Sequence, residues 1–340
     1  MPLQSMIAKT MLKLPPSWLY RMAGGAPVQI AGRTMDPHIQ LLSHGAKTQT
    51  PIHEMEVVAG RAASAAGLAM FAAKPEPGVT VEDIVIPAEG RDVLARVYRP
   101  KTQDPDAALM VYGHMGGGVI GDVEYCHVFC SMIAAIAKRP VVSIDYRLAP
   151  EHKWPAGLND FIDAYLWALG QAEAYGAPAG RAAVGGDSMG GNFAAILSQE
   201  MKRRGAPAPE FQLLVYPAVD MESDTASMTE FGECYPLSTA TMEWFMTHYM
   251  PEGADLGDVR FSPMNETDLS DLPPALIVTA GFDPLVDQAA EYADRLKAAG
   301  VKAVYRCFDG LAHGFTAFTA VSPAADSACR EIAELVRDFK

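Results

Sequence analysis

The sequence predicts an α/β fold built around a mostly parallel sheet, and two observations support this prediction. Short apolar runs recur along the chain, and most of the segments between them have the spacing of helices. The apolar runs lie at 109–112, 141–144, 182–184, 213–216 and 275–278, and the helical segments lie at 123–138, 156–175, 189–204 and 286–299. Buried parallel strands that alternate with helices form a doubly wound sheet covered on both faces.

Three further strands bring the predicted sheet to eight. Residues 79–86 and 93–98 alternate apolar and polar side chains around a turn at 89–90, so we expect an antiparallel pair at one edge of the sheet. A last strand at 301–308 precedes a last helix at 324–339. Because an exposed edge strand can pair with another chain, we expect the last strand to form the contact of a homodimer.

The composition is that of an acidic globular protein. Of the 340 residues, 49% are hydrophobic and 20% are charged, and the net charge is −14 at pH 7. Nucleic acids and anionic membranes bind basic patches, so this charge argues against both as partners. No apolar run reaches the about 20 residues that a membrane span needs, and the N-terminal residues lack the pattern of a signal peptide. We therefore expect no membrane span and a location in the cytoplasm.

The cysteines indicate thiols rather than a metal site. Their number is odd, and no two of them form a CxxC pair: they are Cys126, Cys130, Cys234, Cys307 and Cys329. Buried thiols in a reducing compartment are the simplest interpretation of such a pattern. We therefore expect no metal site.

The most informative motif is a glycine-rich turn that follows the apolar run 182–184. Gly186, Ser188 and Gly190 stand where a strand gives way to a helix. A serine at such a bend adopts a backbone conformation that costs about 1–3 kcal/mol, and the glycines leave room where two backbones nearly touch. The hydroxyl lies at a helix start, which favours negative charge. This arrangement is typical of a nucleophile, although so short a pattern also occurs by chance in ordinary turns.

Three other segments follow strands at the edge where parallel sheets place their sites. Residues 113–118 contain glycines at 113 and 116–118, and consecutive glycines let several N–H groups converge on an oxyanion. Asp283 follows the run 275–278, and His313 follows the last strand. A nucleophile, a carboxylate and an imidazole are therefore predicted at one edge of the sheet.

Each of these segments also has a structural interpretation. The glycine loop could be a flexible turn, which His114 would hold through backbone hydrogen bonds rather than serve as a base. Asp283 could cap the helix that follows it, and His313 could be a solvated loop residue. Asp287 falls inside that helix and is a weaker candidate than Asp283. The charged segment 145–151 is interpreted as structural pairing and turn formation, because ion pairs perturb acids without catalysis.

Taken together, these motifs resemble the hormone-sensitive-lipase-like (bacterial family IV) carboxylesterases of the α/β-hydrolase superfamily. The similar segments are 114–118, 145–151, 186–192, 283–285 and 313–315, and the resemblance covers roughly residues 36–340. The chain order Ser188, Asp283, His313 is the order of this architecture. The resemblance implies an α/β-hydrolase fold: an eight-stranded, mostly parallel sheet flanked by helices, with a helical cap.

The resemblance also implies a serine carboxylesterase that acts on short- to medium-chain acyl esters. Ser188 would attack the ester carbonyl, His313 would accept and return the proton, and Asp283 would orient the imidazole. The partner would be a small-molecule ester, and no cofactor would take part. Two other functions stay open: the same triad acting on amide, formamide or lactone bonds, and a non-catalytic ligand-binding protein with this fold.

The sequence departs from the usual motifs of this family at three positions. Met115 stands in place of a first loop glycine, Gly118 in place of an aromatic residue, and Met189 in place of an alanine. The amides of Gly116, Gly117 and Met189 would still form the oxyanion hole. We therefore expect the departures to affect the range of substrates rather than the type of reaction.

The substrate pocket can be assigned only by residue type. Pockets are mainly apolar, and the apolar side chains near the motifs are Met115, Trp244, Phe245 and Phe315. Taken singly, each of these residue types more often belongs to the core than to a pocket.

Two segments are predicted to form a cap over the site. More than fifty residues separate the strand that ends at Pro217 from the one that starts at Pro274, far more than a usual connection. Residues 36–73 also have a helical pattern. The predicted units are an N-terminal helical cap segment at 1–55, of which 1–30 is an unassigned extension, a cap insertion at 218–261, and a catalytic domain at 56–217 and 262–340.

Overall fold

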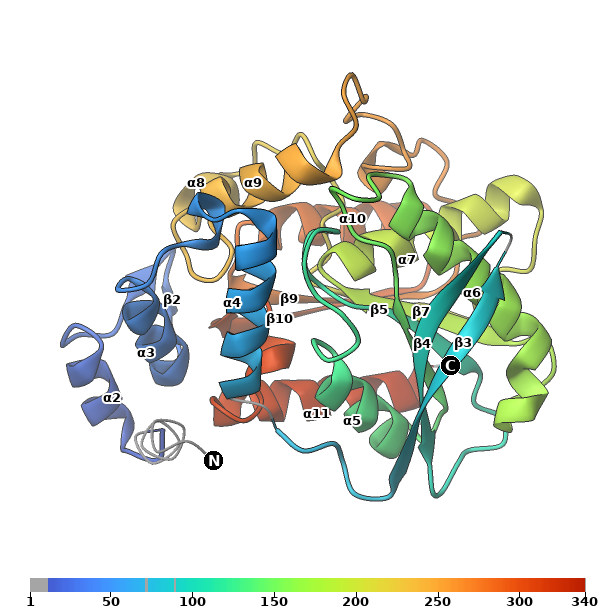
Figure 1. The fold of residues 1–340 in the computed structure, drawn as a ribbon, viewed down its shortest axis with the longest axis horizontal. Coiled ribbons are helices and arrows are strands. Elements are labelled where there is room, and N and C mark those ends of the chain that lie inside the picture. Colours follow the sequence, from blue (N-terminus) through green and yellow to red (C-terminus); the bar gives the residue numbers. More distant parts are fainter. Residues whose placement is uncertain (1–11, 71–72, 89, 340) are drawn as a thin grey trace.

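A computed structural model describes residues 12–70, 73–88 and 90–339. Its centre is an eight-stranded sheet in the order β10-β9-β8-β7-β5-β6-β4-β3 (Figure 1). The strands are β3 (Val79–Ala88), β4 (Arg91–Pro100), β5 (Leu109–Gly113), β6 (Val141–Asp145), β7 (Ala182–Asp187), β8 (Gln212–Val215), β9 (Ala275–Phe282) and β10 (Ala303–Ala312). Strands β5 to β10 run parallel to one another, whereas β4 runs antiparallel to both of its neighbours, β6 and β3. The predicted mostly parallel α/β sheet is confirmed.

Helices cover both faces of this sheet (Figure 1). One face carries α5 (His127–Ala137) and α11 (Pro323–Asp338), and the other carries α6 (Ala156–Gln171), α7 (Met189–Arg204) and α10 (Val286–Ala298). The other α-helices of the described residues are α2 (Pro16–Met22), α3 (Pro37–Ala46), α4 (Val57–Met70), α8 (Ala226–Glu230) and α9 (Thr239–Tyr249). A two-stranded hairpin of β1 (Gln29–Ile30) and β2 (Arg33–Thr34) precedes α3.

Strand β5 shows why continuous apolar runs predict these strands. All of its residues are buried. Leu109 and Val111 belong to the core cluster that includes α6 and α7, whereas Met110 and Tyr112 belong to the cluster that includes α5 and α11. Because successive side chains of a strand point to opposite faces, a strand covered on both faces needs an apolar residue at every position.

The two edges of the sheet are formed as predicted. Strands β3 and β4 pair antiparallel along their whole length at one edge. Gly90, in the turn that connects β3 to β4, adopts a positive φ of 72°. The other predicted turn residue, Glu89, lies outside the described residues. Strand β10 forms the opposite edge and extends to Ala312, so that His313 follows the strand directly.

The continuous helical pattern predicted for residues 36–73 is wrong in one respect. The structure has two helices there, α3 and α4, which are separated by an irregular segment with a short 3₁₀ turn at Ile52–Glu54. Pro51 explains the break, because a proline has no N–H to donate and disfavours helical backbone in the residue before it. Phe71, the last apolar residue of the predicted pattern, lies outside the described residues.

The N-terminal segment contacts the helices of the long connection between β8 and β9. Trp244 on α9 donates from Nε1 to the carbonyl oxygen of Met55 at 3.1 Å, and His53 Nδ1 lies 3.4 Å from Thr241 Oγ1. In Figure 1, α8 and α9 lie beyond one end of α4, away from α5 and α11. Residues near 53–55 and helix α9, which are far apart in the sequence, therefore pack against each other. The first eleven residues of the N-terminal segment lie outside the described residues.

Two compositional expectations can be compared with the structure. All five cysteines are free thiols, and Cys126, Cys130, Cys234 and Cys329 are buried. Within the described residues, no helix is long and apolar enough to cross a bilayer.

Candidate active site

The turn between β7 and α7 has the predicted strained backbone at Ser188. This residue has φ 56° and ψ −115°, in the region with positive φ that costs a non-glycine residue energy. It stands directly before the first residue of α7, Met189. The Ser188 hydroxyl therefore lies at a helix N-terminus, where unpaired N–H groups favour a developing negative charge.

Glycines make this turn sterically feasible. A Cβ atom at Gly186 would lie 2.2 Å from the carbonyl carbon of Gly190, and one at Gly190 would lie 2.0 Å from the carbonyl oxygen of Gly113. Three backbone segments, from β5, β7 and α7, therefore meet without side chains between them. Because the clashing atoms are backbone, the neighbours cannot move aside to admit a side chain.

Ser188, His313 and Asp283 form a continuous chain of hydrogen bonds. His313 Nε2 lies 2.9 Å from Ser188 Oγ, and His313 Nδ1 lies 2.7 Å from Asp283 Oδ2. All three residues are buried. The residues come from the ends of β7, β9 and β10, the edge of the sheet predicted for them.

Asp283 uses its two oxygens for different tasks. While Oδ2 contacts His313, Oδ1 accepts a hydrogen bond from the N–H of Leu285 at 2.9 Å. Helix α10 begins only at Val286 and has no side-chain cap, so Asp283 is not its N-cap. The bond to Leu285 fixes the carboxylate in a local turn, which orients the oxygen that faces the imidazole.

The glycine loop after β5 folds into a tight turn beside Ser188. Gly116, Gly117 and Gly118 have φ of 124°, 62° and 72°, all in the region that favours glycine. A Cβ at Gly116 would lie 2.0 Å from the carbonyl oxygen of Ile120, and one at Gly117 would lie 2.4 Å from the ring of Phe245. The left-handed backbone begins only at Gly116, so the loop accepts Met115 without this strain.

Three amides near Ser188 are available as donors. Within the described part of the chain, no acceptor receives the N–H groups of Gly116, Gly117 or Met189. Gly113 and Gly190 are in close contact, which places the loop after β5 next to the start of α7. Unpaired N–H groups close to a nucleophilic hydroxyl are the kind of donor that can stabilise an oxyanion.

His114 holds the loop rather than acting as a base. It is completely buried, and burial lowers its pKa to about 4. The neutral ring stacks on Tyr146 at 4.1 Å, and its Nδ1 lies 2.6 Å from the carbonyl oxygen of Met115. Tyr146 in turn donates to the carbonyl oxygen of His114 at 2.8 Å. The interpretation of His114 as a residue that ties down the loop agrees with these contacts.

Known proteins resemble this chain over most of its length. A family model described as alpha/beta hydrolase fold matches residues 110–317. The chain belongs to this family. The fold class and the resemblance predicted from the motifs are thereby confirmed.

Named relatives of this α/β hydrolase are ester hydrolases. It is 38% identical to the carboxylic ester hydrolase LipN of Mycobacterium tuberculosis, over 86% of this chain and 80% of the relative. It is 34% identical to an ethyl acetate hydrolase of Pseudomonas putida, over 88% and 96% of the two chains. A crystal structure of an α/β-hydrolase enzyme from the metagenome of Lake Arreo superimposes with a TM-score of 0.84 at 37% identity, over 88% and 95%.

The charged segment 145–151 of the hydrolase forms structural ion pairs. Arg147 pairs with the buried Asp160 on α6 at 2.9 Å. Glu151 accepts two hydrogen bonds from Arg61 on α4, at 2.8 and 2.7 Å. Arg61 also donates to the carbonyl oxygen of Val119, so that this cluster fixes the end of the glycine loop to α4. No motif in the sequence indicated that Arg61 would reach this loop.

The four predicted pocket residues lie in different surroundings. Phe245 contacts the glycine loop at Gly117, and Trp244 packs against Phe245 at 5.4 Å. Met115 is half-buried, and a Cβ at Gly314 would lie 3.4 Å from its sulfur, which places it beside the histidine loop. Phe315 is completely buried, in contact with Tyr216 below that loop.

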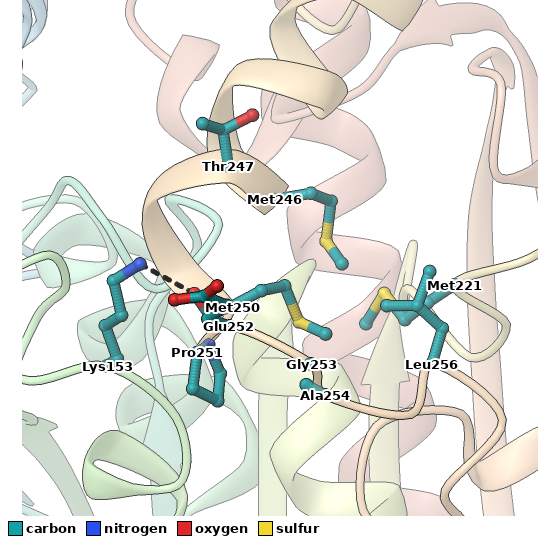
Figure 2. A pocket seen from close by; sticks show the side chains of 10 residues that line it. All are labelled: Lys153, Met221, Met246, Thr247, Met250, Pro251, Glu252, Gly253, Ala254 and Leu256. Atoms are coloured by element: carbon teal, nitrogen blue, oxygen red, sulfur yellow. Dashed lines mark hydrogen bonds between the residues drawn. The ribbon is translucent and has the colours of Figure 1, made fainter.

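An open groove of about 500 Å³ lies beside the C-terminal end of α9 (Figure 2). Its lining is mainly apolar, with a lysine and a glutamate at one end: the residues are Lys153, Met221, Met246, Thr247, Met250, Pro251, Glu252, Gly253, Ala254 and Leu256. Lys153 Nζ donates to the carbonyl oxygen of Met250 at 2.7 Å. Among the described residues, the groove includes neither a member of the hydrogen-bonded chain nor a predicted pocket residue.

Sequence reasoning did not identify the polar residues behind the histidine. Asp187, directly before Ser188, is completely buried and contacts Tyr216 and Thr316. Asp187 and Thr316 are 129 positions apart. Asp187 lies inside the recognised motif, but no pattern in the sequence links it to these partners.

A single added methyl group tests the backbone contact at the turn. The variant Gly190→Ala places a Cβ 2.0 Å from a backbone oxygen, so we expect a loss of about 3 kcal/mol in the free energy of unfolding. Gly170 in α6 has no neighbour within 4 Å of such a Cβ, so Gly170→Ala is the matched control and should change stability by less than about 1 kcal/mol. Thermal unfolding of both variants measures the difference. Equal stability of the two variants would contradict the steric argument.

Proposed function

We propose that the protein is a serine carboxylesterase that hydrolyses short- to medium-chain acyl esters, with Ser188, His313 and Asp283 as its catalytic residues. The observation that carries this proposal is the pair of hydrogen bonds from His313, at 2.9 Å to Ser188 and at 2.7 Å to Asp283. The family and the named ester hydrolases among its relatives support the reaction class. The substrate is a small-molecule ester.

The geometry defines the path of the proton. Ser188 Oγ attacks the ester carbonyl carbon while its proton passes to His313 Nε2. Asp283 holds the other ring nitrogen and stabilises the imidazolium. The imidazolium then gives the proton to the leaving alcohol as the C–O bond breaks, which leaves an acyl-enzyme on Ser188. Water, activated by the same imidazole, releases the carboxylic acid and restores the hydroxyl.

The negative charge of the tetrahedral intermediate is stabilised by the backbone. The N–H groups of Gly116, Gly117 and Met189 form the oxyanion hole, and the start of α7 adds its partial positive charge. In comparable serine hydrolases, one such donor contributes about 2.7–4 kcal/mol to transition-state stabilisation. A backbone donor is retained whatever side chain follows the nucleophile, which is why Met189 is compatible with the reaction.

The substrate lies between the glycine loop, the histidine loop and α9. Met115 of the glycine loop lies beside Gly314 of the histidine loop, and Phe245 on α9 contacts Gly117 of the glycine loop. With Trp244 and Phe315 they constitute the proposed pocket. The groove beside α9 extends the apolar surface of that helix through Met246 and Met250. Methionines adapt to different shapes, which suits a pocket for acyl chains of several lengths.

The cap consists of residues 1–55 and 218–261, and the catalytic domain consists of residues 56–217 and 262–340. The hydrogen bond between Trp244 and Met55 supports this division, since it joins the two cap segments to each other. The position of Phe245 against Gly117 supports it as well, because it places α9 over the oxyanion loop. The cytoplasmic location stays a prediction.

Replacement of the nucleophile tests the proposed reaction. In Ser188→Ala, hydrolysis of a p-nitrophenyl short-chain ester should fall by about 10⁴-fold or more, because no acyl-enzyme can form. The fold should persist, since the change removes one oxygen atom. Initial rates and a circular dichroism spectrum of the variant provide the measurement. Turnover retained by the variant, or a wild-type enzyme that cleaves a panel of amides but no esters, would contradict the proposal.

Enlargement of the pocket tests the assignment of Met115. In Met115→Gly the side chain beside the histidine loop is removed, so the preferred acyl chain should become longer. The variant Met115→Leu keeps the apolar bulk and should retain the wild-type profile. Relative kcat/KM values for p-nitrophenyl esters of increasing chain length measure the effect. An unchanged profile in Met115→Gly would remove Met115 from the pocket.

We also propose a homodimer that forms through the edge strand at residues 301–308. In the described structure, β10 has β9 as a strand neighbour on one side only, and an edge with free backbone groups can pair with a second copy. Val304 on this strand is 37% exposed. Gel filtration with light scattering should give twice the mass of the 36.5 kDa chain. A monomer at micromolar concentration would exclude this contact.

A further inference from the structure

Behind the proposed triad lies a second buried carboxylate, that of Asp187. Its Oδ2 accepts a hydrogen bond from Thr316 Oγ1 at 2.9 Å and one from the Tyr216 hydroxyl at 3.1 Å. The two hydroxyl oxygens also lie 2.5 Å from each other. Asp187, Tyr216 and Thr316 therefore form a closed triangle of polar contacts inside the protein.

This triangle joins the three loops that carry or support the triad. Asp187 ends β7 and precedes Ser188, and Tyr216 directly follows β8. Thr316 lies in the 3₁₀ turn Phe315–Phe318, three positions after His313. The ring of Tyr216 lies 4.7 Å from the ring of His313. A shift of Asp187 would therefore move Tyr216 and Thr316 and, with them, the imidazole of His313.

The backbone of Tyr216 has a conformation that is unfavourable for an L-residue. Its φ is 36°, a conformation that costs an L-residue roughly 1–2 kcal/mol. Such a conformation persists only where the surrounding structure determines it. The bonds of the Tyr216 hydroxyl to Asp187 and Thr316 are part of that surrounding structure.

A count of hydrogens shows that the triangle can hold one more proton. When Asp187 is ionised, the hydroxyls of Tyr216 and Thr316 have only two hydrogens for the three oxygen–oxygen contacts of the triangle. The other carboxylate oxygen, Oδ1 of Asp187, is buried and has no hydrogen-bond partner among the described residues. Protonation of the carboxylate supplies the third hydrogen and removes a buried negative charge. Burial accordingly raises the pKa of Asp187 to about 6. Asp187 thus changes charge in the range in which histidines titrate.

Most of the ionisable groups that face Asp187 do not change charge in this range. Burial raises the pKa values of Tyr112, Tyr146, Tyr216, Cys130 and Cys329 far above neutral pH, so these groups stay uncharged.

The charged partner of Asp187 is His313, whose positive form lowers the pKa of the carboxyl group. By reciprocity, the ionised carboxylate stabilises the imidazolium. Asp283 does the same from the other side of the ring, through direct contact.

We propose that Asp187 is a positioning residue for the triad, an inference that rests on the proposed function. Its carboxylate holds Tyr216 and Thr316 against the histidine loop. It also places a second negative charge near the imidazole, in addition to that of Asp283. The imidazolium that forms during ester hydrolysis is therefore stabilised by two carboxylates rather than by one.

The pH dependence of kcat/KM in Asp187→Asn tests this proposal. Loss of the negative charge disfavours the imidazolium, so the acid limb of the profile should move to lower pH by about half a unit or more. At pH 8, where the wild-type carboxylate is ionised, kcat should fall by about 3- to 10-fold with little change in KM. A residue with a purely structural role would lower activity equally at all pH values and would leave the midpoint in place.

A matched control is Asp145→Asn. Burial raises the pKa of Asp145 to about 6 as well, but the groups that perturb it are Asp122 and Arg96, not the triad. This variant should keep the wild-type midpoint. An unshifted midpoint in Asp187→Asn, or an equal shift in Asp145→Asn, would overturn the proposal.

A second pair of variants decides the question if Asp187→Asn does not fold. Thr316→Val removes a donor from the carboxylate, so Asp187 keeps its proton to higher pH and the acid limb should again move down. Thr316→Ser keeps the hydroxyl and should behave as the wild type. Equal midpoints in these two variants would overturn the proposal, whereas the nucleophile assignment depends separately on Ser188→Ala.

Discussion

The close contact of three backbones at Gly113, Gly186 and Gly190 is the constraint on which the site depends. Because no side chain separates β5, β7 and α7, the chain must turn sharply at Ser188, and the strained φ of 56° follows from this turn. The same contact places the glycine loop of β5 next to the first amide of α7. One steric condition therefore positions both the hydroxyl and the amides that we propose as the oxyanion hole.

The parallel sheet supplies the remaining members of the site. The carboxyl ends of β7, β9 and β10 lie at one edge, so residues that are 125 positions apart, Ser188 and His313, come within hydrogen-bond distance. Further contacts fix two of these loops. Asp283 binds the N–H of Leu285, and the loop of His313 is fixed by Thr316. The carboxylesterase therefore has its reactive groups in place before a substrate binds, which is the main source of catalytic power in such sites.

Most of the sheet and the proposed triad could be predicted from the sequence, because their signals are local. The continuous apolar run of β5 predicts a strand buried on both faces, and the glycines around Ser188 predict a tight turn. The sequence pattern does not predict the break between α3 and α4, because the apolar residues on both sides of Pro51 keep helical spacing even though the proline interrupts the helix.

The contacts behind the triad could not be predicted, because they depend on three-dimensional proximity. No pattern near Thr316 in the sequence predicts its contact with Asp187. The apolar run that contains Tyr216 predicts only a strand residue. Arg61 is similar: its bonds to Val119 and Glu151 arise only when α4 packs beside the glycine loop. Such residues come from separate elements, and their pairing is set by how strands and helices assemble.

The identity of the nucleophile is tested most directly by covalent labelling. A fluorophosphonate probe reacts with an activated serine, and mass spectrometry of the digested protein locates the adduct. If Ser188 is the nucleophile, the protein carries one phosphonylated site, at Ser188, and ester hydrolysis is lost in proportion to the labelled fraction. An active enzyme that carries no adduct, or one that loses activity with the adduct on another residue, would contradict the assignment of Ser188.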